Sequence, residues 1–340
     1  MREVRDTLPV HPVDLEPFRL GDGADRAAVA VEIDRACRDS GFLLVSGHGV
    51  PQATCDAVLD AFGAFFDLPL AEKRRYVVAD ESANRGYSEL GKEALGYSRG
   101  AETPPDLFEA FNVGRDDATG PRYDDYRTYY APNTWPDAPA GLHEAWAAYE
   151  RAIRPVADSL LRAMALALEL PESWFTERLE RAILTTRAIN YERRAGAPDP
   201  LPDQVRMGAH TDYGVLTILL ADDVPGLQVF RDDSWYDVTA PRGTFVCNLG
   251  DMLERWTNNR WTSTLHRVLP PPAGTDGPVR RRSLARFLDC PPDLVVECIP
   301  TCTGPGNPAR YDAVSAGVWL REKILSGRAR RQPDLGEAVV

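Results

Sequence analysis

Apolar residues recur at helical spacing through much of the first half of the chain. An apolar residue at every third or fourth position is typical of a helix with one buried face. Three stretches with this pattern predict helices over residues 25–40, 51–66 and 141–169. Gly41 follows the first of them and is placed to end it. A compact apolar run at 42–45 predicts a strand, and residues 12–20 predict a short strand leading to a turn.

The pattern changes after residue 184, where short apolar segments alternate with Gly, Pro, Asp and Asn. These segments predict strands at 184–191, 214–220, 226–230, 235–239, 244–248, 263–269 and 282–288. Many short strands with regular turns are typical of an all-β sandwich or barrel, and this number suits a double-sheet jelly roll. We therefore expect a mainly β fold with α-helices, in which the helices of the first half cover one outer face of the jelly roll.

The remaining segments complete the prediction of a single domain. Residues 78–135 are polar and rich in Gly, Pro and Tyr, and they predict a long loop region with one strand near 108–113. A chain of 340 residues is long enough for one large domain. The predicted parts of this domain, 1–340, are an N-terminal helical and loop extension at 1–120, a jelly-roll core at 184–290 and a C-terminal helix at 311–326.

Composition and charge bear on three questions: nucleic-acid binding, membrane insertion and cellular location. The formal net charge is −12, and dense runs of arginine occur only at 280–282 and 328–331, so no nucleic-acid partner is predicted. No stretch approaches about 18 uninterrupted apolar residues, so no membrane-spanning helix is expected. The N-terminal sequence lacks a basic head followed by an apolar core, which favours a cytoplasmic location over export. The oligomeric state is left open.

Two histidines and one aspartate form a candidate metal site. His210 and Asp212 are two positions apart just before an apolar strand, and alternate residues of an extended chain point to the same side. His266 lies in another predicted strand. Two His ligands and one carboxylate occupy one face of an octahedron and leave the other sites open for substrate and O2, which suits an Fe(II) oxygenase.

Each part of this candidate site has a simpler interpretation. Many His-x-Asp pairs lie on protein surfaces without a function, and a histidine in an apolar strand is more often a hydrogen-bonded core residue than a ligand. Spacing alone does not decide between these interpretations and a metal site.

A second pair of polar residues changes the balance. Arg281 and Ser283 are two positions apart in a late predicted strand, so they face the same way. A guanidinium fork and a hydroxyl donor together suit the distal carboxylate of a small dicarboxylic acid. The alternative is a group of surface arginines at a turn.

Four segments of the chain resemble the isopenicillin N synthase-like branch of the Fe(II)/2-oxoglutarate-dependent oxygenases. They occur in the family's order and cover most of the chain. These segments are HPVDLEPF with ACRDSGFLLVSGHGVP, AHTDYGVLTILLADDVPGLQVF, NLGDMLERWTNNRWTSTLHRV and RRRSLARF.

The resemblance implies the following fold and ligands. The fold would be a distorted double-stranded β-helix, which is a jelly roll, with an N-terminal helical extension. His210, Asp212 and His266 would hold Fe(II), and Arg281 and Ser283 would bind the 5-carboxylate of 2-oxoglutarate. An early strand of the family often carries a residue that touches the cosubstrate. Here that residue would be Tyr191 or, as second choice, Asn190, although the expected proline after the tyrosine is absent.

The resemblance also implies a reaction. The protein would be a dioxygenase that uses O2 and 2-oxoglutarate to oxidise a small organic metabolite, with succinate and CO2 as co-products. The substrate would be hydroxylated, desaturated or cyclised, in natural-product biosynthesis. The runner-up is an isopenicillin N synthase-like Fe(II) oxidase that does not use 2-oxoglutarate, and a third possibility is a non-catalytic jelly-roll binding module.

Four aromatic residues are candidates for the substrate pocket. Tyr87 and Phe108 lie in the polar region that we expect to cross the mouth of the site, and Phe230 and Phe287 flank the inferred metal and anchor segments. A mixed aromatic and polar pocket suits a small molecule. The alternative is that the aromatic residues of the loop only pack onto the jelly roll.

Overall fold

The computed structural model describes residues 10–80, 83–96, 103–192, 201, 203–271 and 280–328. Within these ranges the α-helices are α1 (Glu16–Leu20), α2 (Gly23–Asp39), α3 (Gln52–Phe66), α4 (Leu70–Arg74), α5 (Pro121–Asp124), α6 (Leu142–Ala167), α7 (Trp174–Arg178), α8 (Asp251–Trp256) and α9 (Ala316–Arg328). A short 3-10 helix, η3, spans Pro300–Cys302.

Strands alternate with these helices. They are β1 (His11–Asp14), β2 (Phe42–Ser46), β3 (Gly86–Ser88), β4 (Glu109–Gly114), β5 (Ile183–Tyr191), β6 (Met207–His210), β7 (Leu216–Ala221), β8 (Leu227–Arg231), β9 (Ser234–Asp237), β10 (Phe245–Leu249), β11 (His266–Val268), β12 (Arg281–Asp289), β13 (Val295–Val296) and β14 (Val314–Ser315).

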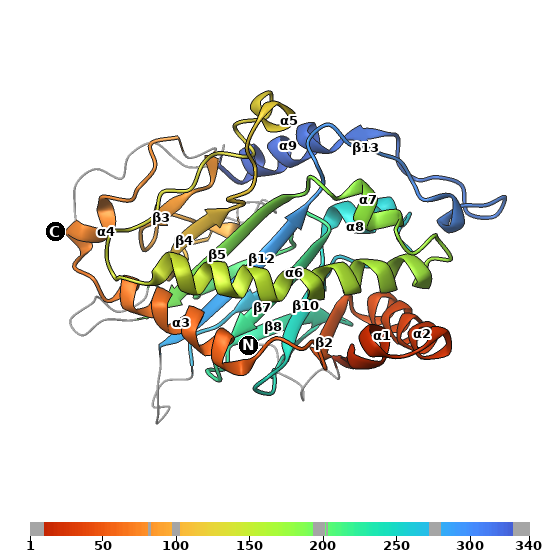
Figure 1. Ribbon diagram of the computed structural model, residues 1–340, viewed down its shortest axis with the longest axis horizontal. Helices are drawn as coiled ribbons and strands as arrows, with labels where there is room; N and C mark the ends of the chain where they lie inside the picture. The colour runs from red at the N-terminus through yellow and green to blue at the C-terminus, as the bar shows by residue number, and fades with distance from the viewer. Residues whose placement is uncertain are drawn as a thin grey trace.

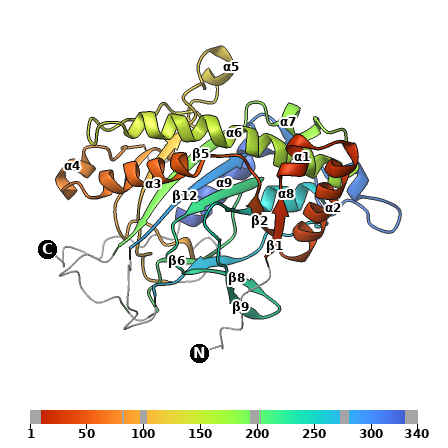
Figure 2. The same cartoon turned by 60° about the horizontal axis from the view of Figure 1, so that its bottom comes forward.

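Two facing sheets form the centre of the fold. In the described part of the chain, the larger sheet has the strand order β1-β2-β10-β7-β12-β5-β4-β3, and the smaller has the order β6-β11-β8-β9. Neighbouring strands are antiparallel except for the pair β1 and β2. Figure 2 shows the smaller sheet below the larger one, on the side away from α3 and α6. A double-sheet arrangement of this kind is the one expected of a jelly roll.

Helices α3 and α6 cover the outer face of the larger sheet (Figure 1). Their apolar faces and that side of the sheet share one core cluster, which includes Phe65, Ile153 and Leu284. Helix α2 packs against α6 at one end. A capping box between Asp22 and Asp25 begins α2, so the helix starts slightly before the predicted boundary. The helices therefore hold the larger sheet from one side and leave its other face for the site.

Most predicted elements are present, with three kinds of difference. The strand expected over 12–20 is β1 followed by helix α1, and the helix expected over 311–326 begins only at Ala316. The predicted loop at 78–135 contains β3 and α5 as well as the expected strand, β4. The short elements β6, α4, α7 and α8 have no counterpart in the prediction, because segments of four to six residues are too short for periodicity to reveal.

Strand β12 lies between β7 and β5, and its side chains alternate between the two faces of the larger sheet. On the inner face it presents five residues to one large cavity: Arg281, Ser283, Ala285, Phe287 and Asp289. On the outer face, Arg282 bonds to Asp60 of α3, and Arg286 bonds to Glu150 of α6. One strand thus joins the helical layer to the interior of the jelly roll.

The pair of Arg286 and Glu150 is a buried ion pair. The guanidinium donates through Nε and Nη2 to the two carboxylate oxygens, at 3.1 and 2.9 Å. Arg286 is 2% exposed, so water does not replace a lost partner. Removal of one partner of such a pair leaves an unpaired charge in the interior.

We expect Glu150→Ala to lower the free energy of unfolding by about 3 kcal/mol because Arg286 would remain charged and buried. The midpoint of chemical denaturation measures this effect. Glu144→Ala on the exposed face of the same helix is the matched control, and it should cost less than about 1 kcal/mol. Equal losses in the two variants would contradict the importance of the ion pair.

Candidate metal centre and its cavity

The chain brings the three candidate ligands together at the edge of the smaller sheet. His210 is the last residue of β6, and Asp212 follows it in the turn before β7. His266 is the first residue of β11 and is paired directly with His210 across the antiparallel ladder. Two adjacent strands therefore place the two imidazoles side by side, with ring centroids 4.3 Å apart.

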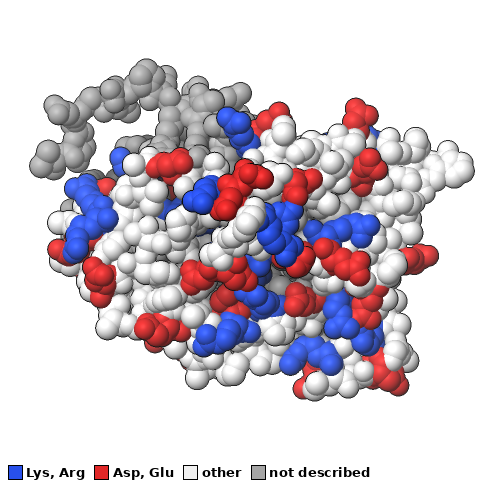
Figure 3. Space-filling view, turned by 45° about the horizontal axis from the view of Figure 1, so that its top comes forward, with Lys and Arg blue, Asp and Glu red and all other residues white. Residues whose placement is uncertain are grey.

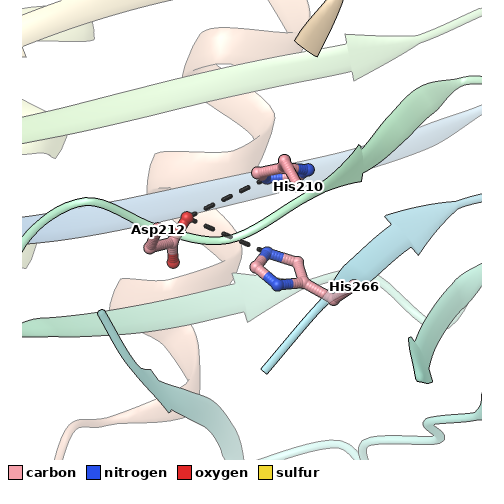
Figure 4. Close-up of side chains that lie close together, drawn as sticks. All are labelled: His210, Asp212 and His266. Carbon is pink, nitrogen blue, oxygen red and sulfur yellow. Dashed lines mark ion pairs between the residues drawn. The ribbon is translucent and has the colours of Figure 1, made fainter. Parts of the chain in front are cut away.

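The three side chains point toward a common centre. Asp212 Oδ1 lies 3.9 Å from His210 Nε2 and 3.8 Å from His266 Nε2. One potential ligand atom from each residue lies within 4.8 Å of the others, and all three residues are buried. Figure 4 shows both rings turned toward the Asp212 carboxylate. Ligand atoms that each stand about 2 Å from one metal lie within about 4 Å of one another, so the two distances from Asp212 to the histidines fit a single bound ion.

Backbone carbonyls fix the tautomer of both histidines. His210 Nδ1 donates to the carbonyl oxygen of Gly208 at 2.8 Å, and His266 Nδ1 donates to that of Thr264 at 3.0 Å. Since a carbonyl only accepts, the neutral rings carry their proton on Nδ1 and keep a lone pair on Nε2. Burial lowers the pKa of His210 to about 4, with a further contribution from His266, so this ring is neutral at physiological pH.

Two polar side chains orient the carboxylate. Thr217 Oγ1 and Asn248 Nδ2 both donate to Asp212 Oδ2, at 2.5 and 2.6 Å. Burial alone would raise the pKa of Asp212, but the two imidazoles and these two hydrogen bonds hold it below the usual value. In addition, the first amide of α8 donates to the Asp212 carbonyl at 2.8 Å. The carboxylate is thus charged, and its Oδ1 atom is directed toward the histidines.

Close backbone packing supports the Asp212 turn. Gly250, just before α8, lies against the backbone of Gly214, and a Cβ atom at position 250 would stand 2.3 Å from the Gly214 oxygen. Only glycine permits this approach. The short helix α8, which the sequence pattern did not predict, therefore holds the turn that carries the aspartate.

Arg281 and Ser283 face the same cavity from the larger sheet. Arg281 Nε and Ser283 Oγ are buried and have no hydrogen-bond partner among the described residues. Buried polar atoms are nearly always bonded, so two such orphaned donors side by side indicate a missing acceptor. A ligand carboxylate is an acceptor that suits a guanidinium and a hydroxyl together.

Tyr191 and Asn190 lie on opposite faces of β5. Tyr191 pairs with Arg281 in the sheet register, lines the cavity and has its ring centroid 5.3 Å from the guanidinium carbon. Burial raises the pKa of the Tyr191 hydroxyl, although Arg281 acts in the opposite direction. Asn190 instead bonds to Glu109 and Arg280 on the other face. Of these two predicted cosubstrate contacts, only the tyrosine borders the cavity.

Two of the four aromatic candidates border the cavity and two do not. Tyr87 and Phe287 line the cavity, and the Tyr87 hydroxyl also donates to Glu109 at 2.6 Å. Phe108 packs against Tyr191 and does not border the cavity in the described part of the chain. Phe230 packs against Trp235 on the smaller sheet and is likewise absent from the described cavity wall. Sequence composition does not distinguish a pocket aromatic from a core aromatic.

The cavity between the two sheets has a volume of about 1520 Å³. This exceeds the roughly 300–1,000 Å³ of a typical site for one small ligand. The cavity contains the triad at one level, the pair Arg281 and Ser283 at another, and open space beyond them. It has room for a cosubstrate and a substrate at the same time.

Three ionisable residues at or near the cavity were not predicted. Arg187 of β5 is paired with Glu93 from the loop after β3. Asp106 accepts from the backbone amide of Gly208, beside His210, and burial raises its pKa to about 7. Asp289 ends β12, and burial together with the charge of Asp212 raises its pKa to about 7. A lone acidic residue near a turn carries no sequence signal that would have marked it.

A jelly roll with two imidazoles and one carboxylate converging in an interior cavity defines the class of mononuclear non-haem iron oxygenases. Comparison with known proteins agrees with this class. Residues 186–289 match the family described as the 2OG-Fe(II) oxygenase superfamily, and residues 10–138 match the one described as non-haem dioxygenase in morphine synthesis N-terminal. The chain belongs to the 2OG-Fe(II) oxygenase superfamily.

Curated relatives cover nearly the whole chain. The 2-oxoglutarate-Fe(II) type oxidoreductase hxnY of Emericella nidulans is 34% identical over 91% of this chain and 87% of its own length. The validamycin A dioxygenase of Streptomyces hygroscopicus subsp. limoneus is 34% identical over 92% of this chain and 85% of its own length. These relatives confirm the predicted family and enzyme class.

A solved structure supports the fold. The full-length T7H of Neurospora crassa in complex with alpha-KG matches with a TM-score of 0.82 and 27% identity, over 93% of this chain and 95% of that one. The predicted jelly roll is therefore confirmed, as are Fe(II), 2-oxoglutarate and O2 as cofactor and cosubstrates. The protein is an Fe(II)/2-oxoglutarate-dependent dioxygenase that acts on small metabolites. This agrees with use of 2-oxoglutarate and disfavours the oxidase that does not use it.

No helix among the described residues is long and apolar enough to cross a membrane.

Proposed function

We propose that His210, Asp212 and His266 bind the Fe(II) ion and that Arg281 and Ser283 bind the 5-carboxylate of 2-oxoglutarate, with Tyr191 against the cosubstrate. The observation that carries this assignment is that three convergent ligand atoms share a cavity with two buried donors that lack an acceptor. Asn190 is omitted because its side chain bonds on the other face of β5.

The chain's own residues would perform the following tasks. The Nδ1 bonds of both histidines keep their Nε2 atoms available as ligands, and Thr217 with Asn248 keeps the aspartate charged and oriented. Bound Fe(II) and 2-oxoglutarate supply the activation of O2, with succinate and CO2 as co-products. The two sheets enclose the site and hold substrate beside the metal, so that the reactive centre is separated from bulk water.

The proposed substrate is a small organic metabolite, which is hydroxylated, desaturated or cyclised in secondary metabolism in the cytoplasm. Relatives with names such as validamycin A dioxygenase and the azadirone synthase of Melia azedarach, at 30% identity, support this class. Figure 3 shows acidic and basic side chains interspersed on one face of the molecule, and that face offers no broad basic surface for a nucleic acid. Substrate space in the cavity is bounded by Phe287 and Tyr87.

Anaerobic addition of Fe(II) and 2-oxoglutarate tests the proposal. The complex should develop a weak visible charge-transfer band, and a screen of metabolites in air should release succinate in step with product. Tight zinc binding without the band would indicate a binding module instead. Substrate oxidation without succinate would indicate an oxidase that does not use 2-oxoglutarate.

A further inference from the structure

Asp289 occupies a part of the cavity to which the proposed chemistry gives no task. It is the last residue of β12, in register with Ile183 of β5, and it lines the cavity on the same face as Arg281 and Ser283. Its side chain is half-buried, while the neighbouring Leu288 and Cys290 are buried. The carboxylate therefore borders the open space of the cavity.

The carboxylate has no counter-charge among the described residues. Four carboxylates line the described cavity wall, and three are engaged: Glu89 with Arg74, Glu93 with Arg187, and Asp212 with Thr217 and Asn248. Asp289 alone makes no hydrogen bond and no ion pair with a described residue. An enclosed carboxylate without a partner is costly to ionise, and a cationic ligand beside it would favour the charged form.

The surroundings of Asp289 fix its position and supply no cation that pairs with it. Its Oδ1 atom lies over Gly214, where a Cβ atom would stand only 2.2 Å from it. Lys323 of α9 lies 5.9 Å from the Tyr213 ring, but its ammonium bonds to Asp251 at 2.8 Å. The carboxylate is thus held in place by packing, and this nearby cation is committed elsewhere.

The position of Asp289 points to the substrate rather than to 2-oxoglutarate. Along β12, Phe287 pairs with Thr217, which bonds to the outer oxygen of Asp212, so the metal triad lies between the two ends of the strand. Arg281 lies at one of these ends and Asp289 at the other, about 26 Å apart along the strand. The cosubstrate occupies the Arg281 side, which leaves the Asp289 side to the substrate.

Much of the cavity wall beyond the metal is apolar, although Arg321 of α9 also borders the cavity. Ile183, Tyr213, Leu320 and Ile324 line the cavity and belong to one hydrophobic cluster. A charged head group on a hydrocarbon stem matches an acidic residue at the end of an apolar wall.

We propose that Asp289 binds a protonated amine or guanidinium of the substrate and so orients a cationic metabolite over the metal. This inference rests on the proposed function, because it assigns the substrate of that same site. Asp289 is a specificity residue and takes no part in binding Fe(II) or 2-oxoglutarate.

The test compares pairs of probes that differ only in charge. L-Arginine is paired with L-citrulline, and butylguanidinium with butylurea, so that each pair exchanges a guanidinium for an uncharged urea group. Binding to the anaerobic complex of the full chain with Fe(II) and 2-oxoglutarate is measured by calorimetry. At least one cationic probe should bind more tightly than its neutral partner by about 30-fold or more, the effect of a buried charge pair. The variant Asp289→Asn should reduce the preference to less than about threefold.

A matched control uses the same chemical change nearby. Asp293 lies four residues further on, pairs with Arg181 at the surface and does not border the described cavity. The variant Asp293→Asn should therefore keep the full preference for the cation. Absence of a preference in the wild-type protein for any cationic probe would overturn the proposal. Survival of the preference in Asp289→Asn would do the same.

The charge-transfer band separates this inference from the proposed function. If the wild-type protein forms the band and releases succinate but shows no preference for cations, only the role of Asp289 is wrong. If the band itself is absent, the proposed function is wrong. Weakened Fe(II) binding in Asp289→Asn would assign the residue to the metal centre and overturn its role in specificity.

Discussion

The variant Asp212→Ala should lose Fe(II) binding and turnover together. Asp212 supplies the only negative charge of the triad, and without it two neutral imidazoles remain to hold a divalent cation. Loss of a group that merely orients a ligand weakens metal binding by about 10- to 100-fold, so loss of the ligand itself should exceed that range. The measurements are the iron content after anaerobic loading, the charge-transfer band and the rate of succinate release.

The control for this variant is Asp312→Ala. It removes an exposed carboxylate that does not line the described cavity, so it should change none of the three readouts. Thermal unfolding checks that both variants are folded. Full activity and iron content in Asp212→Ala would refute the assignment of the triad. His210→Ala should give the same result as Asp212→Ala, because either loss leaves two ligands.

The variant Arg281→Ala should raise the 2-oxoglutarate concentration that gives half-maximal activity about 100-fold or more. Loss of one partner of a buried, hydrogen-bonded charge pair costs about 2–5 kcal/mol, and 1.4 kcal/mol corresponds to tenfold. Arg281 is buried, and its Nε has no acceptor within the described chain, so the cosubstrate is expected to supply it. The rate of succinate release against 2-oxoglutarate concentration, at saturating Fe(II), measures the change.

Arg282→Ala provides a matched control one position away. Arg282 faces the helical layer, where it bonds to Asp60 and to the Leu59 carbonyl. Its removal should reduce stability modestly and leave the 2-oxoglutarate requirement unchanged. An unchanged requirement in Arg281→Ala, or an equal increase in both variants, would indicate that another group anchors the cosubstrate.

Local patterns predicted the parts of the site that lie on regular strands. Alternation along β12 correctly placed Arg281 and Ser283 on one face because the strand has nine residues and no bulge. The same alternation places Tyr191 and Asn190 on opposite faces of β5. The register with β12 then decides which of them faces the cavity. That register depends on pairing between segments far apart in sequence, and period alone does not supply it.

Other features depend on long-range contacts that leave no local signal. Glu150 and Arg286 meet across 136 positions of the chain, and neither sequence neighbourhood marks the other. Helix α8 has six residues, fewer than two turns, so its periodicity is not recognisable. Asp289 stands before Cys290 and two prolines, a context that predicts a turn rather than a cavity wall.

The two faces of β12 limit how this protein can diverge. Removal of a single residue from the middle of the strand would exchange the faces on one side of the deletion, so that either the proposed cosubstrate anchor would leave the cavity or Arg286 would turn away from α6. Evolution of this segment is therefore restricted to substitution at constant length. Positions 287 and 289 can vary without loss of the attachments to α3 and α6, which makes them the natural sites for a mutant library that seeks new substrates.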